Sequence, residues 1–148
     1  MKRKIKFRVW DKEQKRILSH ELIDEYDKDG LVLWGDILSG KDKTVELMQY
    51  TGLKDKSGRE IYEGDIYKRK LDKAARFRDS GSENWCDYWL IHWIEKSSCF
   101  TTTCIADYDS NTGKMIKKRS NVNPYSKRFD EMDEYIGNIY ENPELLNY

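Results

Sequence analysis

Apolar and polar side chains alternate along much of this chain, which is the pattern of β-strands with one buried face. At the amino terminus, residues 4–9 alternate basic with apolar side chains, residues 11–16 are polar, and residues 17–23 are extended in character. This order predicts a strand, a turn and a second strand. A turn at residues 27–30 follows, and the apolar run 31–38 predicts either a short buried strand or a turn of helix.

The clearest hairpin in the sequence reads LMQYTGLKDKSGREIYEGDIYKRK. Residues 47–53 and 59–71 are rich in apolar, aromatic and β-branched side chains, and the intervening KDKSG, which ends at Gly58, is turn-forming. Gly64 and Asp65 predict a tight bend before a new strand, because glycine takes a positive φ and aspartate accepts hydrogen bonds from nearby backbone N–H groups. We therefore expect Gly58, Gly64 and Asp65 to be structural turn residues.

A second hairpin is predicted from residues 87–109, where aromatic and β-branched side chains form two arms around a turn at residues 95–98. The first arm is ambiguous, because Trp85, Trp89 and Trp93 also have the spacing of one helix face. The β-branched second arm needs a partner strand, and this favours a strand for the first arm.

The last third of the chain begins with a polar excursion at residues 107–130. A short strand is predicted at residues 135–140, and the Asn-Pro pair that follows ends it. Residues 144–146 indicate a final helical turn.

Composition supports a folded chain with an aromatic core. Charged residues make up 36% of the 148 residues and aromatic residues 13%, at a formal net charge of +0. Disorder goes with a large net charge and few aromatic residues, so we expect a globular protein. No apolar run approaches the roughly 18 residues of a membrane span, and no apolar segment like that of a secretory signal follows the charged start. We expect a soluble, cytoplasmic protein with no membrane partner.

The three cysteines are expected to be reduced thiols. An odd, sparse set forms no disulfide framework, and an intracellular chain keeps its thiols reduced. Cys99 and Cys104 are weak candidates for metal ligands, because residues five apart on a straight strand face opposite sides. Since His20 and His92 are the only histidines, we expect neither a structural metal nor a cofactor.

Three blocks of sequence carry a resemblance to a known family. They read IKFRVWDKEQKRIL at residues 5–18, LMQYTGLKDKSGREIYEGDIYK at residues 47–68 and YIGNIYENPELL at residues 135–146. In order and spacing they resemble the signature blocks of the YopX family, small proteins of phages and prophages in Gram-positive bacteria. The resemblance implies a mainly β, β-rich α+β fold, with an amino-terminal β-containing subdomain and a Src-homology-3-like small β-barrel whose first strand follows YEGDI. It implies no enzymatic activity, ligand or catalytic residue.

The resemblance also implies a division of the chain into two parts. Residues 1–58 are expected to form the amino-terminal subdomain, and residues 59–148 the barrel. A basic insertion at residues 68–83 and the polar excursion at 107–130 depart from the typical family pattern. We expect a role specific to this chain to lie in these two segments.

Residues 107–118 have a partial resemblance to a calcium-binding loop. Asp107, Asp109 and Asn111 occupy the first, third and fifth positions of such a loop. The sixth position holds Thr112 where glycine is needed, and the twelfth holds Lys118 where a bidentate acid is needed. A polar turn is therefore the better interpretation.

The acidic residues Glu60, Glu63 and Asp65 could do acid–base work if burial separated their pKa values. No histidine, serine–base pair or glycine-rich phosphate loop accompanies them in the sequence, and Asp65 already has a structural role as a turn acceptor. His92, within a predicted strand, is expected to be a packed strand residue and not a ligand or base. We therefore expect no catalytic residue and no enzyme.

Two classes of function remain. The first is a protein-interaction module that binds a host or phage protein through the loops of the barrel or a sheet edge. The alternative is a nucleic-acid-binding accessory protein, in which the strongest basic run contacts phosphates and Trp85, Tyr88 or Trp89 stack on bases. The basic side chains of that run are Lys68, Arg69, Lys70, Lys73, Arg76 and Arg78. A net charge of +0 favours the first class.

Charge is unevenly distributed along the chain, since the amino terminus and residues 68–78 are basic whereas DEMDEY and ENPE are acidic. Complementary surfaces on one small chain favour self-association, and exposed strand edges offer pairing. We therefore also expect a homo-oligomer.

Overall fold

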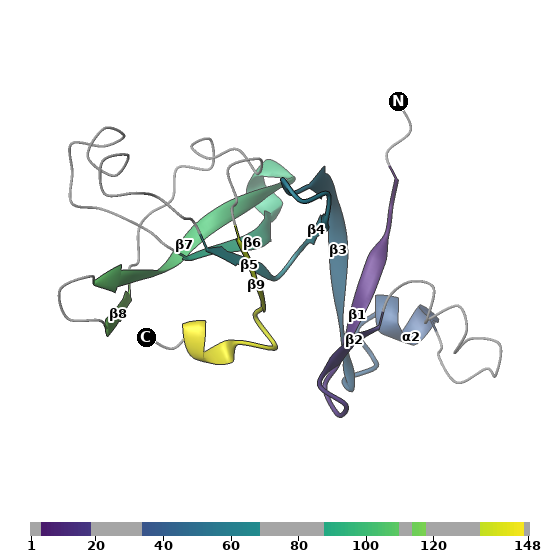
Figure 1. The fold of residues 1–148 in the computed structure, drawn as a ribbon. Coiled ribbons are helices and arrows are strands. Elements are labelled where there is room, and N and C mark those ends of the chain that lie inside the picture. Colours follow the sequence, from purple (N-terminus) through teal and green to yellow (C-terminus); the bar gives the residue numbers. More distant parts are fainter. Residues whose placement is uncertain (1–3, 19–33, 69–87, 110–113, 118–133, 147–148) are drawn as a thin grey trace. The chain divides into compact units, whose positions relative to one another are not determined.

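The computed structural model describes residues 4–18, 34–68, 88–109, 114–117 and 134–146 (Figure 1). These residues form antiparallel strands in two sheets with little helix, which confirms the mainly β fold. The chain forms two compact units: unit 1 contains residues 1–53 and 60–63, and unit 2 contains residues 54–59 and 64–148. The division at residues 58 and 59 that the sequence suggested stays a prediction.

Unit 1 is built on a four-stranded sheet with the order β2-β1-β3-β4 (Figure 1). Strand β1 pairs antiparallel with both β2 and β3. The elements are β1 at Phe7–Asp11, β2 at Arg16–Leu18, α2 at Trp34–Leu38, β3 at Val45–Lys54 and β4 at Glu60–Tyr62. The apolar run at residues 31–38 therefore ends in a helical turn, one of its two predicted forms.

Strict alternation of side chains gives the two faces of this sheet different chemistry. Val9 lies opposite Leu18 on one side and Leu47 on the other, and these residues pack with Val45 in an apolar cluster. Arg8 lies opposite Met48 and therefore projects to the other face. The alternation of basic and apolar residues read from the sequence is thus the alternation between an apolar face and a mixed face, on which Arg8 lies beside the buried Trp10 and Met48.

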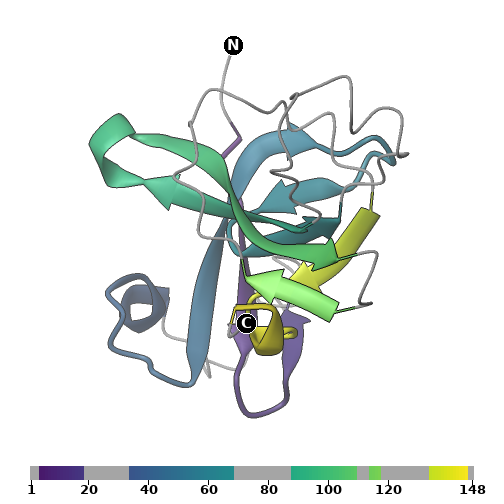
Figure 2. The same cartoon turned by 90° about the vertical axis from the view of Figure 1, so that its left-hand side faces the viewer.

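Unit 2 is built on a five-stranded sheet with the order β8-β7-β6-β5-β9. Consecutive strands pair with one another, and the last strand returns beside the first, which is the arrangement of a Src-homology-3-like barrel. Figure 2 shows from a second side that β6 and β7 form one long, bent hairpin. The strands are β5 at Asp65–Lys68, β6 at Tyr88–Ile94, β7 at Cys99–Asp109, β8 at Lys114–Lys117 and β9 at Glu134–Asn138.

Short 3-10 turns complete unit 2 at Glu95–Ser97 and Pro143–Leu146, close to the turn and the final helical turn predicted from the sequence. Trp89 and Trp93 lie in β6, so the helical alternative for this arm is wrong, because pairing with β7 decides between the two patterns. The predicted polar excursion at residues 107–130 includes the end of β7 and the strand β8, and its other residues lie outside the described residues.

A buried glycine at the start of β5 connects three parts of unit 2. Gly64 has a φ of +80°, the left-handed conformation that the sequence led us to expect. Its N–H donates to the carbonyl of Ile91 at 2.8 Å, and its carbonyl accepts the N–H of Ile139 at 2.9 Å. The turn before β5, the strand β6 and the chain after β9 are therefore joined through one residue.

The cysteines differ from the expectation of three reduced thiols. Cys104 is buried and disulfide-bonded, whereas Cys99 is free and half-buried. The expectation is wrong for Cys104, because a count of cysteines does not report which sulfur atoms the fold brings together.

In the part of the chain that the structure describes, no helix has both the length and the apolar character needed to cross a membrane.

Replacing Gly64 by alanine should lower the free energy of unfolding by about 1–3 kcal/mol, because a side chain at positive φ is strained. Chemical denaturation of the two proteins measures the difference. Gly35→Ala is the matched control, since an added Cβ there meets nothing within 4 Å and alanine is favoured in a helix. Equal stability of Gly64→Ala and the unchanged protein would contradict the role given to this glycine.

Candidate functional site

The basic run proposed for nucleic-acid contact lies almost entirely outside the described residues. Lys68, the last residue of β5, is half-buried, and its Nζ lies 5.5 Å from the centre of the Tyr88 ring on β6. The other members of the run, Arg69, Lys70, Lys73, Arg76 and Arg78, fall outside the described residues. The nucleic-acid site stays a prediction.

The predicted turn residues occupy tight backbone positions. Gly58, with a φ of +86°, donates its N–H to the carbonyl of Asp55 at 3.0 Å. Burial is the largest single effect on the pKa of Asp55 and raises it. The carboxylate accepts hydrogen bonds from the N–H groups of Ser57 and Arg59, and such bonds together lower the pKa below its usual value. Asp65 is fully buried at the start of β5.

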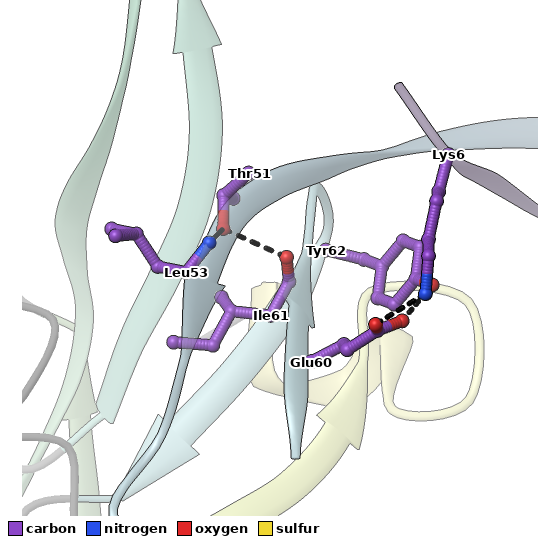
Figure 3. A network of polar contacts seen from close by, with 6 residues as sticks. All are labelled: Lys6, Thr51, Leu53, Glu60, Ile61 and Tyr62. Atoms are coloured by element: carbon purple, nitrogen blue, oxygen red, sulfur yellow. Dashed lines mark hydrogen bonds and ion pairs between the residues drawn. The ribbon is translucent and has the colours of Figure 1, made fainter. Parts of the chain in front are cut away.

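A network of polar contacts connects the start of β1 with the edge strand β4 of unit 1 (Figure 3). Lys6, just before β1, forms an ion pair with Glu60 on β4. The hydroxyl of Tyr62 donates to the other oxygen of the Glu60 carboxylate at 2.8 Å. The side chains of Lys6 and Glu60 keep 35% and 27% of their exposure, so solvent screens the pair and limits its contribution to stability.

Aromatic rings of β3 and β4 lie beside the cations of this network. The Nζ of Lys6 lies 5.7 Å from the centre of the Tyr50 ring, and the guanidinium of Arg8 lies 4.5 Å from the centre of the Tyr62 ring. The Tyr50 and Tyr62 rings are 5.4 Å apart. We refer to Lys6, Arg8, Tyr50, Glu60 and Tyr62 as the polar–aromatic cluster. It combines cation–π contacts with one ion pair on the mixed face of the sheet.

The tyrosines of the cluster are held in their neutral form. Burial is the main cause that raises the pKa of Tyr62, and the hydrogen bond to Glu60 and its negative charge add to the effect. Burial also raises the pKa of Tyr50, while the charge of Lys6 opposes the shift. At neutral pH both phenols are therefore protonated, and that of Tyr62 donates to Glu60.

The acidic residues singled out in the sequence do not form one acid–base pair. Glu60 is paired with Lys6 and accepts from Tyr62, and it belongs to unit 1 together with Glu63. Asp65 belongs to unit 2. Sequence proximity alone suggested this cluster. The parity of positions within each strand, which puts Lys6 with Arg8 and Glu60 with Tyr62, is the part of this arrangement that the sequence contains.

Two exposed apolar side chains lie where β1 begins and β3 ends. Ile5 is 68% exposed and Leu53 is 43% exposed. The backbone between them is fixed, because Tyr50 donates its N–H to the Lys6 carbonyl at 2.9 Å. The Thr51 hydroxyl donates to the Ile61 carbonyl at 2.8 Å and accepts the Leu53 N–H at 3.2 Å (Figure 3). We call Ile5 and Leu53 the apolar edge.

His92 on β6 lies on the sheet of unit 2 and is half-buried. Its Nε2 is 2.5 Å from the hydroxyl oxygen of Thr103 on β7. Among the described residues, no group of three or more histidine, cysteine or acidic side chains is placed to hold a metal ion.

Comparisons with known proteins give matches of very different extent. The family model described as YopX protein matches residues 6–147. The alanine–tRNA ligase of Buchnera aphidicola subsp. Schizaphis graminum is 27% identical over 146 residues, and this chain spans 16% of the length of that relative. The crystal structure of protein EF1440 from Enterococcus faecalis is similar with a TM-score of 0.48 and 22% identity, over 98% of this chain and 99% of that one.

Stability should fall as the pH rises above about 10, the pKa of an unfolded tyrosine. Burial raises the pKa of Tyr67 as well as that of Tyr62, so both phenols stay protonated in the folded chain at a pH where they ionise in the unfolded chain. Their contribution is therefore complete below pH 10 and is lost above it. Denaturation between pH 8 and about 11 measures this loss. Tyr62→Phe and Tyr67→Phe should each reduce its slope, and an unchanged slope in both would contradict this account.

Proposed function

The chain belongs to the YopX family, and we propose that it is a non-enzymatic accessory protein of a phage or prophage that binds another protein. The proposed binding surface is the apolar edge on unit 1. The partner is a protein of the host or of the phage. The proposed place of action is the host cytoplasm.

The observation that carries this proposal is the exposure of Ile5 and Leu53 on a rigid part of unit 1. Removing apolar surface from water is favourable by roughly 25 cal/mol for each Å², so a partner that covers both side chains gains binding free energy. The hydrogen bonds of Thr51 and Tyr50 hold the backbone around them. Little ordering of this backbone is therefore needed on binding, which removes one cost of association.

The polar–aromatic cluster supplies the second part of such a surface. Protein interfaces combine an apolar centre with a polar rim that stays accessible to water. Lys6 and Glu60 are partly exposed, and Lys6 directly follows Ile5 in the chain. Their charges can pair with a partner at the rim, where they would affect specificity and the rate of association more than affinity.

The same cluster supports a role without catalysis. Glu60 is neutralised by Lys6, and the tyrosines keep their protons at neutral pH. An acid–base catalyst needs a group whose pKa lies near the working pH and which is available to the substrate. We do not extend the activity of the alanine–tRNA ligase to this chain, because the match spans 16% of that protein.

Substituting both residues of the apolar edge, as Ile5→Ser with Leu53→Ser, should weaken capture of a partner about tenfold or more. The tagged chain is used to capture proteins from cells that carry the phage or prophage, and quantitative mass spectrometry compares the variants. Leu38→Ser is the matched control, since Leu38 is also exposed but lies in α2. A partner bound equally by all three proteins would contradict the assignment of the surface.

A nuclease-treated sample in the same experiment separates the two classes of function. Capture that survives nuclease supports the protein-binding proposal. Capture that is lost on nuclease treatment and weakens steeply with salt would instead identify nucleic acid as the partner, because phosphate contacts release counterions.

Self-association is the last part of the proposal, and the expected result is a mass above that of one chain in light scattering at tens of micromolar protein. The double substitution of Ile5 and Leu53 should shift the mass toward that of a monomer, because the apolar edge would no longer be covered by a second copy. Leu38→Ser should leave the mass unchanged. A monomeric mass for the unchanged chain would refute self-association.

A further inference from the structure

The last residue of β9 has a buried hydrogen-bond donor with no partner among the residues that the structure describes. Asn138 is 0% exposed. Its Oδ1 accepts the N–H groups of Tyr140 at 2.9 Å and Glu141 at 3.0 Å. These two bonds fix the orientation of the amide, because exchanging its oxygen and nitrogen would bring donors against donors. Its Nδ2 is therefore the buried atom that has no partner among the described residues.

A buried carboxylate lies on the strand directly opposite. Asp65 on β5 pairs with Asn138 on β9, and Asp65 is also 0% exposed. Side chains directly opposite each other in an antiparallel pair have Cβ atoms about 4.5–5.5 Å apart. A carboxylate has several acceptor positions, so Asp65 can accept a further hydrogen bond in addition to its other contacts.

The charges at this position select the kind of molecule that fits between the two residues. The hydrogens of the Asn138 amide repel a cation, and the carboxylate of Asp65 repels an anion. A neutral molecule that accepts one hydrogen bond and donates another satisfies both groups. Because both side chains are buried, the molecule must also be small. Water meets these requirements, and buried water typically bonds to otherwise unsatisfied polar groups.

We infer that unit 2 contains one buried water molecule, which accepts a hydrogen bond from Asn138 Nδ2 and donates one to the carboxylate of Asp65. Asn142 Oδ1, a second buried atom that has no partner in the described part of the chain, is an acceptor in the same turn and can take the other hydrogen of the water. This turn is closed by the Asn142 N–H, which donates to the Asn138 carbonyl at 2.9 Å. The water therefore connects β5 with the turn that follows β9.

The direct test is magnetisation transfer from water to side-chain amides in the full-length, ¹⁵N-labelled chain. The Asn138 amide should show nuclear Overhauser and rotating-frame cross-peaks of opposite sign, which is the signature of a water that stays bound. The side-chain amide of Gln14, an exposed residue in the turn between β1 and β2, is the control in the same spectrum, because only short-lived surface water reaches it. A visible Asn138 amide with no water cross-peak, or with only the short-lived type seen at the surface, would overturn the inference.

Exchanging the two side chains, as Asp65→Asn with Asn138→Asp, gives a second test. Aspartate keeps the oxygen that accepts the N–H groups of Tyr140 and Glu141, so the turn is retained. The water would then donate to the carboxylate at position 138 and accept from the amide at position 65. Its cross-peak should therefore move to the amide introduced at position 65. A folded double variant in which this amide lacks a water cross-peak would contradict the bridge. The measurement on the unchanged chain decides the matter if the variant does not fold.

Discussion

The backbone of Gly64 is the constraint on which unit 2 depends. This buried residue donates to Ile91 and accepts from Ile139, so its position is fixed by groups far away in the sequence. Its φ of +80° turns the chain into β5 while both bonds are made. An L-residue in the left-handed region is strained by about 1–2 kcal/mol, and an unmade buried backbone bond costs a similar amount. Glycine is the residue that meets both demands without strain.

Local features of the fold could be read from the sequence because they depend on neighbours in the chain. The alternation at residues 4–9 follows from the two-residue period of a strand, and the turn ending at Gly58 follows from its residue types. Pairing between distant segments needs information that periodicity does not contain. The spacing of Trp89 and Trp93 fitted a helix or a strand, and pairing of β6 with β7 decided between them. For the same reason the disulfide of Cys104 could not be foreseen.

The polar–aromatic cluster shows the same limit at the level of a site. Glu60 stood beside Glu63 and Asp65 in the sequence, yet its ion-pair partner is Lys6, 54 positions away. Strand β3 lies between β1 and β4, so Lys6 reaches Glu60 across Tyr50, whose ring lies under its ammonium group. The parity of these positions was available in the sequence, but the order of the strands was not.

In the signature blocks, three glycines have backbone conformations or close contacts that the fold needs. Gly58 closes the hairpin turn, Gly64 joins three segments, and a Cβ at Gly137 would lie 2.1 Å from the Asn142 side-chain oxygen. Such residues identify the family through its fold. In the role that we propose, a partner would be recognised by positions that the fold does not constrain. Ile5 is such a position, because a side chain that is 68% exposed contributes little to the core. In the protein-binding role that we propose, an interface would account for this exposed apolar side chain.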